Sequence, residues 1–209
     1  MPKRFESAAR AIVTVGHGRG FIVETYRARY VISAAHCLPF LPPCRAAAHV
    51  EERTYQMLLA PLGKNRLVSA ECQFADPVAD IAILGRPDTQ VLLDHAKAYD
   101  DFIDSHETIT ITTAAMEGRA WIFALDGHRF RCTVEHRGRL LWTATDEPVT
   151  EEMSGSPILS NDGTAIGVVS VSSESGNIPR MHTGPDANLA AHLPAWFLQE
   201  IDRPPALAR

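Results

Sequence analysis

Short runs of β-branched and aromatic residues recur through the first half of the chain, separated by glycine, proline, asparagine or charged turns. Runs of this length and composition are typical of β-strands rather than helices. We predict strands at Ala11–Val15, Gly20–Glu24, Tyr30–Ser33, Tyr55–Leu59, Arg66–Glu71 and Ile81–Leu84.

A second series of strand-like runs follows in the other half. Asp126-Gly127 and Asp162-Gly163 add strong signals for tight turns between neighbouring strands. The predicted strands are Thr108–Thr113, Ala120–Leu125, Arg129–Glu135, Leu140–Thr145, Pro157–Leu159 and Ala165–Val171. About six short strands per half suit two small barrels.

Two stretches break the strand pattern. Pro87–Ser105 is polar and acidic and is interpreted as a linker between the halves. Near the end, apolar residues recur at helical spacing, and Pro194 marks a first helical turn. We therefore predict an all-β fold of two six-stranded antiparallel β-barrels with a C-terminal α-helix. The expected divisions are residues 8–90, linker 91–106, residues 107–186 and helix 187–202.

Composition and charge narrow the function classes. The 209 residues are 45% apolar, enough for a sizeable core, and the formal charge is −5. This acidic balance argues against nucleic-acid and anionic-membrane partners. No run approaches a membrane span, and no apolar segment follows the charged N-terminal residues as in a signal peptide. We expect a cytoplasmic protein that needs no cofactor.

Three segments carry the candidate chemistry. Tyr30–Cys37 is a strand ending in His36, Asp76–Leu84 places Asp80 before a strand, and Glu151–Ile158 contains Ser154 on a tight turn. A serine hydroxyl is a poor nucleophile unless a base lies within hydrogen-bond reach and a third group orients that base. Each residue alone has an ordinary structural explanation, but the order His, Asp, Ser matches one known triad arrangement.

Together, Ala-Ala-His-Cys, Asp-Ile-Ala-Ile-Leu and Ser-Gly-Ser-Pro resemble the trypsin-like (chymotrypsin-fold) serine peptidases, of bacterial type with some HtrA-like features. The resemblance spans nearly the whole chain. It implies that Ser154 attacks the scissile carbonyl, that His36 takes and returns the proton, and that Asp80 holds the imidazole.

The cysteines depart from secreted members of that family. Those relatives pair the cysteine after the catalytic histidine with one near the upstream glycine-rich strand, but residues 17–20 here contain none. Cys37 is therefore expected to be a reduced, buried thiol. A zinc site made of His36, Cys37, Cys44 and His49 is disfavoured, because the Cys37–Cys44 spacing is unusual and His36 has a better role. No metal is expected.

The main departure from the family's pattern lies two residues before Ser154, the expected nucleophile. Relatives carry a glycine there, whose amide forms the oxyanion hole with that of the serine. This chain has Glu152, so the expected backbone donors are Glu152 and Ser154. A glutamate at positive φ costs about 1–2 kcal/mol, and we expect the peptide to rest flipped with one donor missing. Met153 rules out the aspartate ion pair of trypsin-type activation.

The resemblance also suggests the substrate contacts. Residues 167–172 resemble the strand that pairs with substrate backbone, which assigns Ser170, Val171 and Ser172 to substrate binding. The base of the specificity pocket falls on Pro148, which favours apolar P1 residues, although Glu147 is adjacent.

The sequence therefore predicts a serine endopeptidase that acts on protein or peptide substrates through an acyl-enzyme and is latent until its oxyanion hole is rearranged, with an activating partner as one route. The alternative is a catalytically weak peptidase-like module that binds extended peptides or a partner protein by strand addition. A self-cleaving assembly protein is a third, less supported reading.

Overall fold

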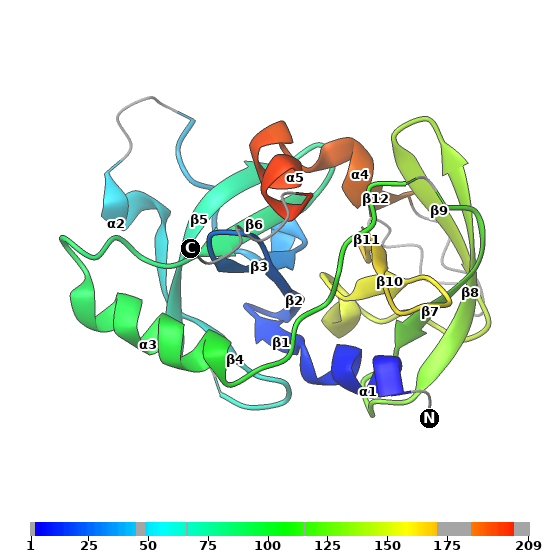
Figure 1. The fold of residues 1–209 in the computed structure, drawn as a ribbon, viewed down its shortest axis with the longest axis horizontal. Helices are drawn as coiled ribbons and strands as arrows, with labels where there is room; N and C mark the ends of the chain where they lie inside the picture. Colours follow the sequence, from blue (N-terminus) through cyan, green and yellow to red (C-terminus); the bar gives the residue numbers. More distant parts are fainter. Residues whose placement is uncertain (1–2, 45–48, 66, 115, 171–184, 203–209) are drawn as a thin grey trace, which may run out of the picture.

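The computed structural model describes residues 3–44, 49–65, 67–114, 116–170 and 185–202. Two β-barrels lie side by side, with helices at their junction and on their outer faces (Figure 1). The predicted fold class is confirmed, because each barrel has six strands and all their pairings are antiparallel.

The first barrel has the strand order β1-β2-β3-β6-β5-β4 and closes through pairing of β1 with β4. Its core is made of inward-facing apolar side chains, and Gly20 lies where a Cβ would come within 2.7 Å of Val15 and Val31. All six predicted strands are present. Their bounds are β1 (Ile12–Val15), β2 (Gly18–Glu24), β3 (Arg29–Ser33), β4 (Thr54–Pro61), β5 (Val68–Asp76) and β6 (Ile81–Gly85).

The second barrel has the order β10-β11-β12-β9-β8-β7 and closes through a short pairing between Leu159 and Trp121. The bounds are β7 (Gly118–Phe123), β8 (Arg129–Arg137), β9 (Leu140–Thr145), β10 (Pro157–Leu159), β11 (Ala165–Val168) and β12 (Pro185–Asn188). The sixth strand is therefore β12, which the sequence did not predict.

The predicted strand Thr108–Thr113 is wrong. This segment makes only an isolated bridge between Ile111 and Ala165. Ile109 and Ile111 are buried as the β-like pattern suggested, but the backbone runs between the barrels instead of joining either sheet. Its Ile109 amide donates to the Ile22 carbonyl in the first barrel (2.8 Å), and its Thr112 amide donates to the Ala165 carbonyl in the second (3.1 Å).

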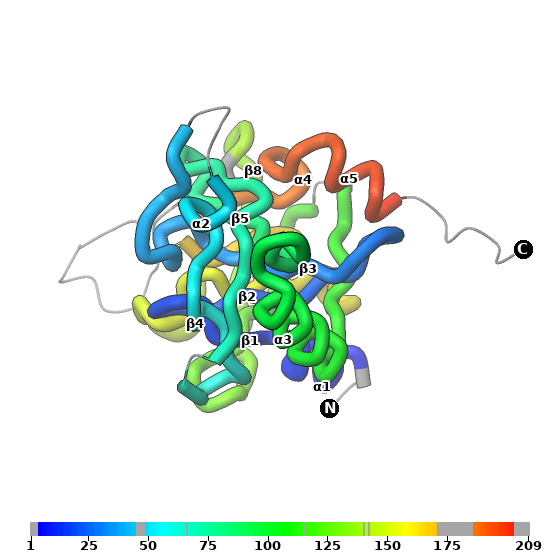
Figure 2. Tube along the Cα trace, turned by 90° about the vertical axis from the view of Figure 1, so that its left-hand side faces the viewer, coloured from blue at the N-terminus to red at the C-terminus, as the bar shows by residue number. Residues whose placement is uncertain are grey.

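The stretch expected as a linker contains helix α3 (Leu93–Asp104), which packs on β5 of the first barrel (Figure 2). Its buried residues are spaced at helical intervals and are Ala96, Tyr99, Phe102 and Ile103. The acidic composition of the exposed face concealed this pattern.

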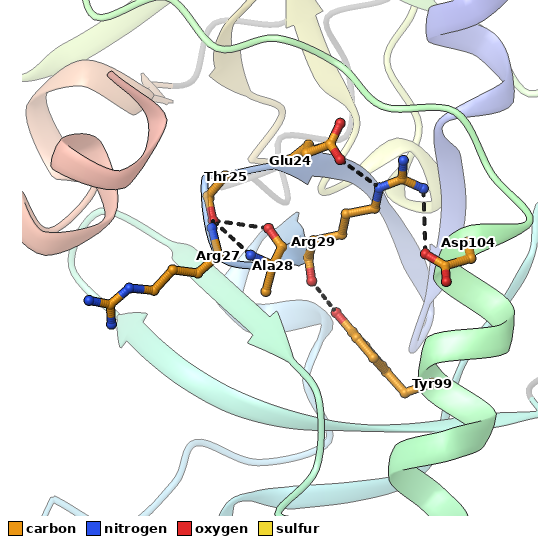
Figure 3. Close-up of polar contacts among 7 residues, drawn as sticks. All are labelled: Glu24, Thr25, Arg27, Ala28, Arg29, Tyr99 and Asp104. Carbon is orange, nitrogen blue, oxygen red and sulfur yellow. Dashed lines mark hydrogen bonds and ion pairs between the residues drawn. The ribbon is translucent and has the colours of Figure 1, made fainter. Parts of the chain in front are cut away.

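Polar contacts join α3 to the β2–β3 turn (Figure 3). Arg29 forms ion pairs with Glu24 (3.3 Å) and with Asp104 of the helix (3.7 Å). The buried Tyr99 hydroxyl donates to the Arg29 carbonyl at 3.2 Å. Together with the buried apolar face of α3, the Tyr99 hydrogen bond explains why a polar segment is held on the barrel.

The C-terminal helix is divided into α4 (Leu189–His192) and α5 (Ala195–Ile201). Pro194 lacks an N–H and has extended backbone angles as the N-cap of α5, so the helix cannot run continuously from residue 187. Residues 187–188 belong to β12 instead. The short helix α2 (Val50–Arg53) precedes β4.

Helix α1 (Lys3–Arg10), also not predicted, leads directly into β1 of the first barrel but contacts the second (Figure 1). The Phe5 ring meets Trp121 of β7 edge to face, with centroids 6.2 Å apart. The guanidinium of Arg129 lies 4.0 Å from the centre of the Phe5 ring. Helix α1 therefore connects the two barrels.

Candidate active site

His36 lies in a single 3₁₀ turn (Ala35–Cys37) that follows β3. Its Nδ1 is 2.6 Å from Asp80 Oδ2, and its backbone N–H donates to Asp80 Oδ1 at 2.9 Å. The hydrogen bond to Asp80 raises the pKa of His36, against the opposing effect of burial. The side chain is 45% exposed, so its outer edge is accessible.

Asp80 is held at the end of a tight turn. The Asp76 carboxylate accepts the N–H groups of Val78 and Ala79, which closes the turn. Asp80 itself has φ +57°, a left-handed conformation that is uncommon outside glycine, and its carbonyl accepts the Ala35 N–H. Two local hydrogen-bond sets thus orient the carboxylate toward the histidine turn.

Ser170 supplies a further hydrogen bond to that carboxylate, because its hydroxyl donates to Asp80 Oδ2. Burial, the largest single influence, raises the pKa of Asp80, but the hydrogen bonds from His36 and Ser170 outweigh it and hold the pKa below its ordinary value. Asp80 is therefore ionised over the neutral range.

Asp186 is a site residue that sequence reasoning missed. It lies on β12, is 1% exposed, and its Oδ1 accepts the Ser170 N–H at 3.2 Å while Oδ2 accepts the Thr143 hydroxyl at 2.6 Å. Ser170 thus links two carboxylates, donating its amide to Asp186 and its hydroxyl to Asp80. No motif surrounds Asp186 in the sequence, and its strand was not predicted.

Ser154 lies on the tight turn before β10 and is 2% exposed. Its carbonyl accepts the Arg19 N–H at 2.7 Å and lies 3.6 Å from the Cys37 sulfur, which places the turn beside the residue that follows His36. Gly155 has φ +82°, and a Cβ there would lie 1.9 Å from the Arg19 carbonyl oxygen. Only glycine fits this position, so the Ser-Gly pair is required by the close approach of β2.

The structure therefore brings His36, Asp80, Ser170 and Ser154 together at the junction of the barrels. Asp80 and His36 come from the first barrel, and the two serines come from the second. Among the described residues, no hydrogen bond joins the Ser154 hydroxyl to His36.

The residues before Ser154 form a 3₁₀ turn, Glu151–Met153. The Ser154 N–H donates to the Glu151 carbonyl at 3.0 Å, and the Met153 N–H donates to the Thr150 carbonyl at 3.0 Å. An oxyanion hole needs the Ser154 N–H to point at substrate. Here an internal carbonyl occupies that donor.

Glu152 is exposed and avoids the strained backbone expected of it. The described non-glycine residues with positive φ are Met57 and Asp80 alone, so Glu152 bears no such strain in this turn. The pKa of Glu152 is lowered by its own backbone N–H, by the Thr150 side chain and by the charge of Arg19. This geometry agrees with the expected flipped peptide, in which one amide donor is missing. The turn reaches that arrangement without placing Glu152 at positive φ, so the expected energetic cost does not arise.

Pro148 is exposed in the loop between β9 and the Glu151–Met153 turn. The adjacent Glu147 accepts a hydrogen bond from His128 Nε2 at 2.8 Å, while His128 Nδ1 lies 2.5 Å from Asp126. The carboxylate of Glu147 is thus engaged by the β7–β8 turn. Val171 and Ser172 lie outside the described residues.

Within the described ranges, no group of three or more His, Cys, Asp or Glu side chains could hold a metal ion. His36 is engaged by Asp80 and Cys37 is buried, whereas Cys44 is exposed and the His49 amide bonds to Glu52 in the α2 capping box. The zinc alternative is therefore not supported by this structure.

Comparison with known proteins identifies solved structures of similar fold. No protein-family model matches the chain, and no curated protein matches it. A serine endoprotease from Yersinia pestis matches with a TM-score of 0.56 and 18% identity over 90% of this chain, which spans 62% of that protein. A human pathogenic astrovirus serine protease matches with a TM-score of 0.55 and 15% identity, over 89% of this chain and 94% of the other.

The inactive form of Rv3671c from M. tuberculosis H37Rv, a serine-to-alanine mutant, matches with a TM-score of 0.53 and 16% identity, over 96% of this chain and 92% of the other. At these identities the likeness shows the fold. The chain has the double-barrel fold of the chymotrypsin-like serine peptidases, as its motifs implied. Among the helices that the structure describes, none is long and apolar enough to cross a membrane.

Proposed function

We propose that this protein is a serine endopeptidase that uses His36, Asp80 and Ser154. The observation that carries the proposal is the 2.6 Å contact between His36 Nδ1 and Asp80 Oδ2, on a fold whose neighbours are serine proteases. Asp80 holds a proton on Nδ1, which leaves Nε2 free to act as the base.

In the proposed reaction, His36 Nε2 takes the proton of Ser154 Oγ as that oxygen attacks the scissile carbonyl. The tetrahedral intermediate collapses to an acyl-enzyme when His36 returns the proton to the leaving amine. Water, deprotonated by the same imidazole, then attacks the ester carbonyl, and the imidazolium returns the proton to Ser154 Oγ as the acid is released. No cofactor enters these steps.

The resting state is proposed to be latent. The Ser154 N–H is bound to the Glu151 carbonyl, and losing one oxyanion donor typically costs about 10²–10³ in rate. Activation would require the Glu151–Glu152 peptide to rotate, so that its N–H replaces its carbonyl beside the substrate oxygen. Substrate binding or a partner protein could supply the free energy for that rotation.

The alternative is a peptidase-like module that binds extended peptides or a partner protein without cutting them. The occupied Ser154 amide favours this reading, and the Asp80–His36 contact opposes it. Strand addition beside Ser170 would need no oxyanion hole.

Labelling with a fluorophosphonate probe separates the two. Capture of the probe at Ser154, absent in Ser154→Ala and His36→Ala variants with unchanged circular dichroism, supports the peptidase. Peptide binding by a folded protein that is labelled at Ser154 neither in the wild type nor in Glu152→Gly, the variant expected to free the oxyanion hole, supports the binding module.

A further inference from the structure

Ser170 lies just beyond the pairing of two strands in the second barrel. The β11–β12 ladder ends with the pair Val168–Ala187, two residues before Ser170. The Ser170 N–H donates instead to the side chain of Asp186, at 3.2 Å. A carboxylate on β12 therefore takes the place of a strand carbonyl and fixes the backbone of Ser170.

Asp186 is itself anchored in the sheet of the second barrel. It lies opposite Leu141 of β9, and its Oδ2 accepts the hydroxyl of Thr143, on the same strand, at 2.6 Å. The residue is 1% exposed. Burial of a carboxyl group costs free energy that its hydrogen bonds must offset, so packing alone does not account for an acid at this position.

The residue before Ser170 is bonded to the turn that carries Ser154. The Val169 N–H donates to the Ser156 carbonyl at 2.9 Å, and the Val169 carbonyl accepts the Gly155 N–H at 2.8 Å. The backbone that Asp186 fixes is therefore continuous with the segment that holds the proposed nucleophile.

The Ser170 hydroxyl reaches the first barrel, where it donates to Asp80 Oδ2. The same oxygen lies 2.6 Å from His36 Nδ1, so it contacts both side chains. A serine side chain has three staggered rotamers, and its backbone determines where each of them points. The position of the Ser170 backbone therefore decides whether its hydroxyl reaches the acid that orients His36.

We propose that Asp186 is a positioning residue for this site: it fixes the Ser170 amide and thereby aims the Ser170 hydroxyl at Asp80. A line of hydrogen bonds then runs from Thr143 in the second barrel, through Asp186 and Ser170, to Asp80 in the first. The inference deepens the proposed function, on which its effect on reactivity rests, but the contacts can be tested without catalysis.

The first test follows Ser170 by NMR in the full chain. Asp186→Ala removes the acceptor, so the Ser170 amide should exchange about two- to tenfold faster, as expected for the loss of one hydrogen bond. The Ser170 hydroxyl proton, which the bond to Asp80 protects, should lose protection by a similar factor. Asp186→Asn keeps a side-chain oxygen for the amide and should stay closer to the wild type.

Asp146→Ala is the matched control, because Asp146 is an exposed acid of the same barrel that pairs with Arg131 at 2.9 Å. It should change neither proton of Ser170. An unchanged Ser170 hydroxyl proton in folded Asp186→Ala would overturn the proposal.

A second pair of variants decides the question if Asp186→Ala does not fold. Thr143→Val removes the hydroxyl that donates to Asp186, whereas Thr143→Ser keeps it. Only the valine variant should speed exchange of the two Ser170 protons. Equal exchange in the two Thr143 variants would count against the line of hydrogen bonds.

Fluorophosphonate labelling at Ser154 tests whether the effect passes through the Ser170 hydroxyl. Ser170→Ala removes that hydroxyl but keeps the amide, and should slow labelling about two- to tenfold. Asp186→Ala should slow labelling about as much in the wild type but no further in Ser170→Ala, because both changes break the same connection. A residue that merely stabilises the fold would slow labelling in both backgrounds, and equal losses in both would overturn the proposed route.

The two readouts separate this inference from the peptidase proposal. Loss of hydroxyl protection together with a non-additive loss of labelling supports both. Loss of hydroxyl protection in a protein that is labelled neither as the wild type nor as Glu152→Gly supports the positioning of Ser170 by Asp186 and refutes the peptidase.

Discussion

The backbone N–H of Ser154 donates to the carbonyl of Glu151 at 3.0 Å, so the amide expected to stabilise an oxyanion is already bound within its own turn. The proposed base His36 is bonded to Asp80, whereas the amide proposed for the oxyanion hole is not free. If the proposed function holds, the orientation of the Glu151–Glu152 peptide limits the activity rather than the absence of a catalytic side chain.

Glu152→Gly should raise kcat by about tenfold or more, about 1.4 kcal/mol in the activation barrier. Glycine accepts the positive φ of the productive turn, and the recovered donor acts mainly on the transition state. Glu152→Ala separates the backbone effect from the charge, because alanine removes the carboxylate but keeps a Cβ; its gain should be smaller. The idea fails if the glycine variant hydrolyses a small peptide no faster than the wild type.

Ser154→Ala and His36→Ala should abolish peptide hydrolysis and probe labelling with the fold intact. Asp80→Asn should reduce turnover by about 10⁴, because the asparagine favours the wrong imidazole tautomer. Hydrolysis assays on matched, folded samples check all three. Normal turnover by Ser154→Ala would contradict the proposed nucleophile.

The pH dependence of kcat/KM should follow the protonation of His36. The base must be neutral to accept a proton, so kcat/KM should fall as the pH drops through the His36 pKa. Because the hydrogen bond to Asp80 raises that pKa, the midpoint should lie above 6.5, the ordinary value for histidine. Asp80→Asn should move the midpoint of the residual activity to lower pH, and a midpoint that stays in place would show that another group controls this limb.

The preferred P1 residue should be small or medium-sized and apolar. Pro148 carries no charge, and the neighbouring Glu147 is engaged by His128 at 2.8 Å. Profiling against a peptide library decides this. A dominant preference for arginine or lysine would contradict it, and loss of that preference in Glu147→Gln would identify the acid responsible.

One cysteine should react rapidly with a maleimide in the native protein. Cys44 is exposed, whereas burial raises the pKa of Cys37 and of Cys72 to about 11 and that of Cys132 to about 12. Mass spectrometry should therefore show one fast label in the native state and four in denaturant without reductant. Cys44→Ser should remove the fast label, and only two labels in denaturant would indicate a disulfide.

Much of the fold could be predicted because strand signals are local. Each first-barrel strand is a short run of apolar and β-branched residues between turn signals. The failures share a cause. Ile109 and Ile111 have the strand pattern because they are buried, but burial between two barrels does not require sheet pairing. Helix α3 was missed because its exposed acidic face dominates its composition.

In the candidate site, short motifs predicted His36, Asp80 and Ser154, because each of these residues lies in a recognisable turn. Arg19 and Asp186 carry no such signal. Arg19 contacts Phe123 and Asp186 contacts Ser170. Both contacts join residues that are far apart in the sequence, so a single sequence does not display them. The sequence singled out Glu152 because it replaces a glycine. The negative φ of its turn could be seen only in the structure.

Helix α1 has a consequence for how the protein unfolds. It begins the first barrel but buries Phe5 against Trp121 and Arg129 of the second, so neither barrel can melt without exposing apolar surface on the other. The two barrels should therefore behave as one cooperative unit, in which a destabilising change in either lowers a shared melting temperature. Since His36 and Ser154 belong to different barrels, this cooperativity also keeps their relative positions fixed up to the point of global unfolding.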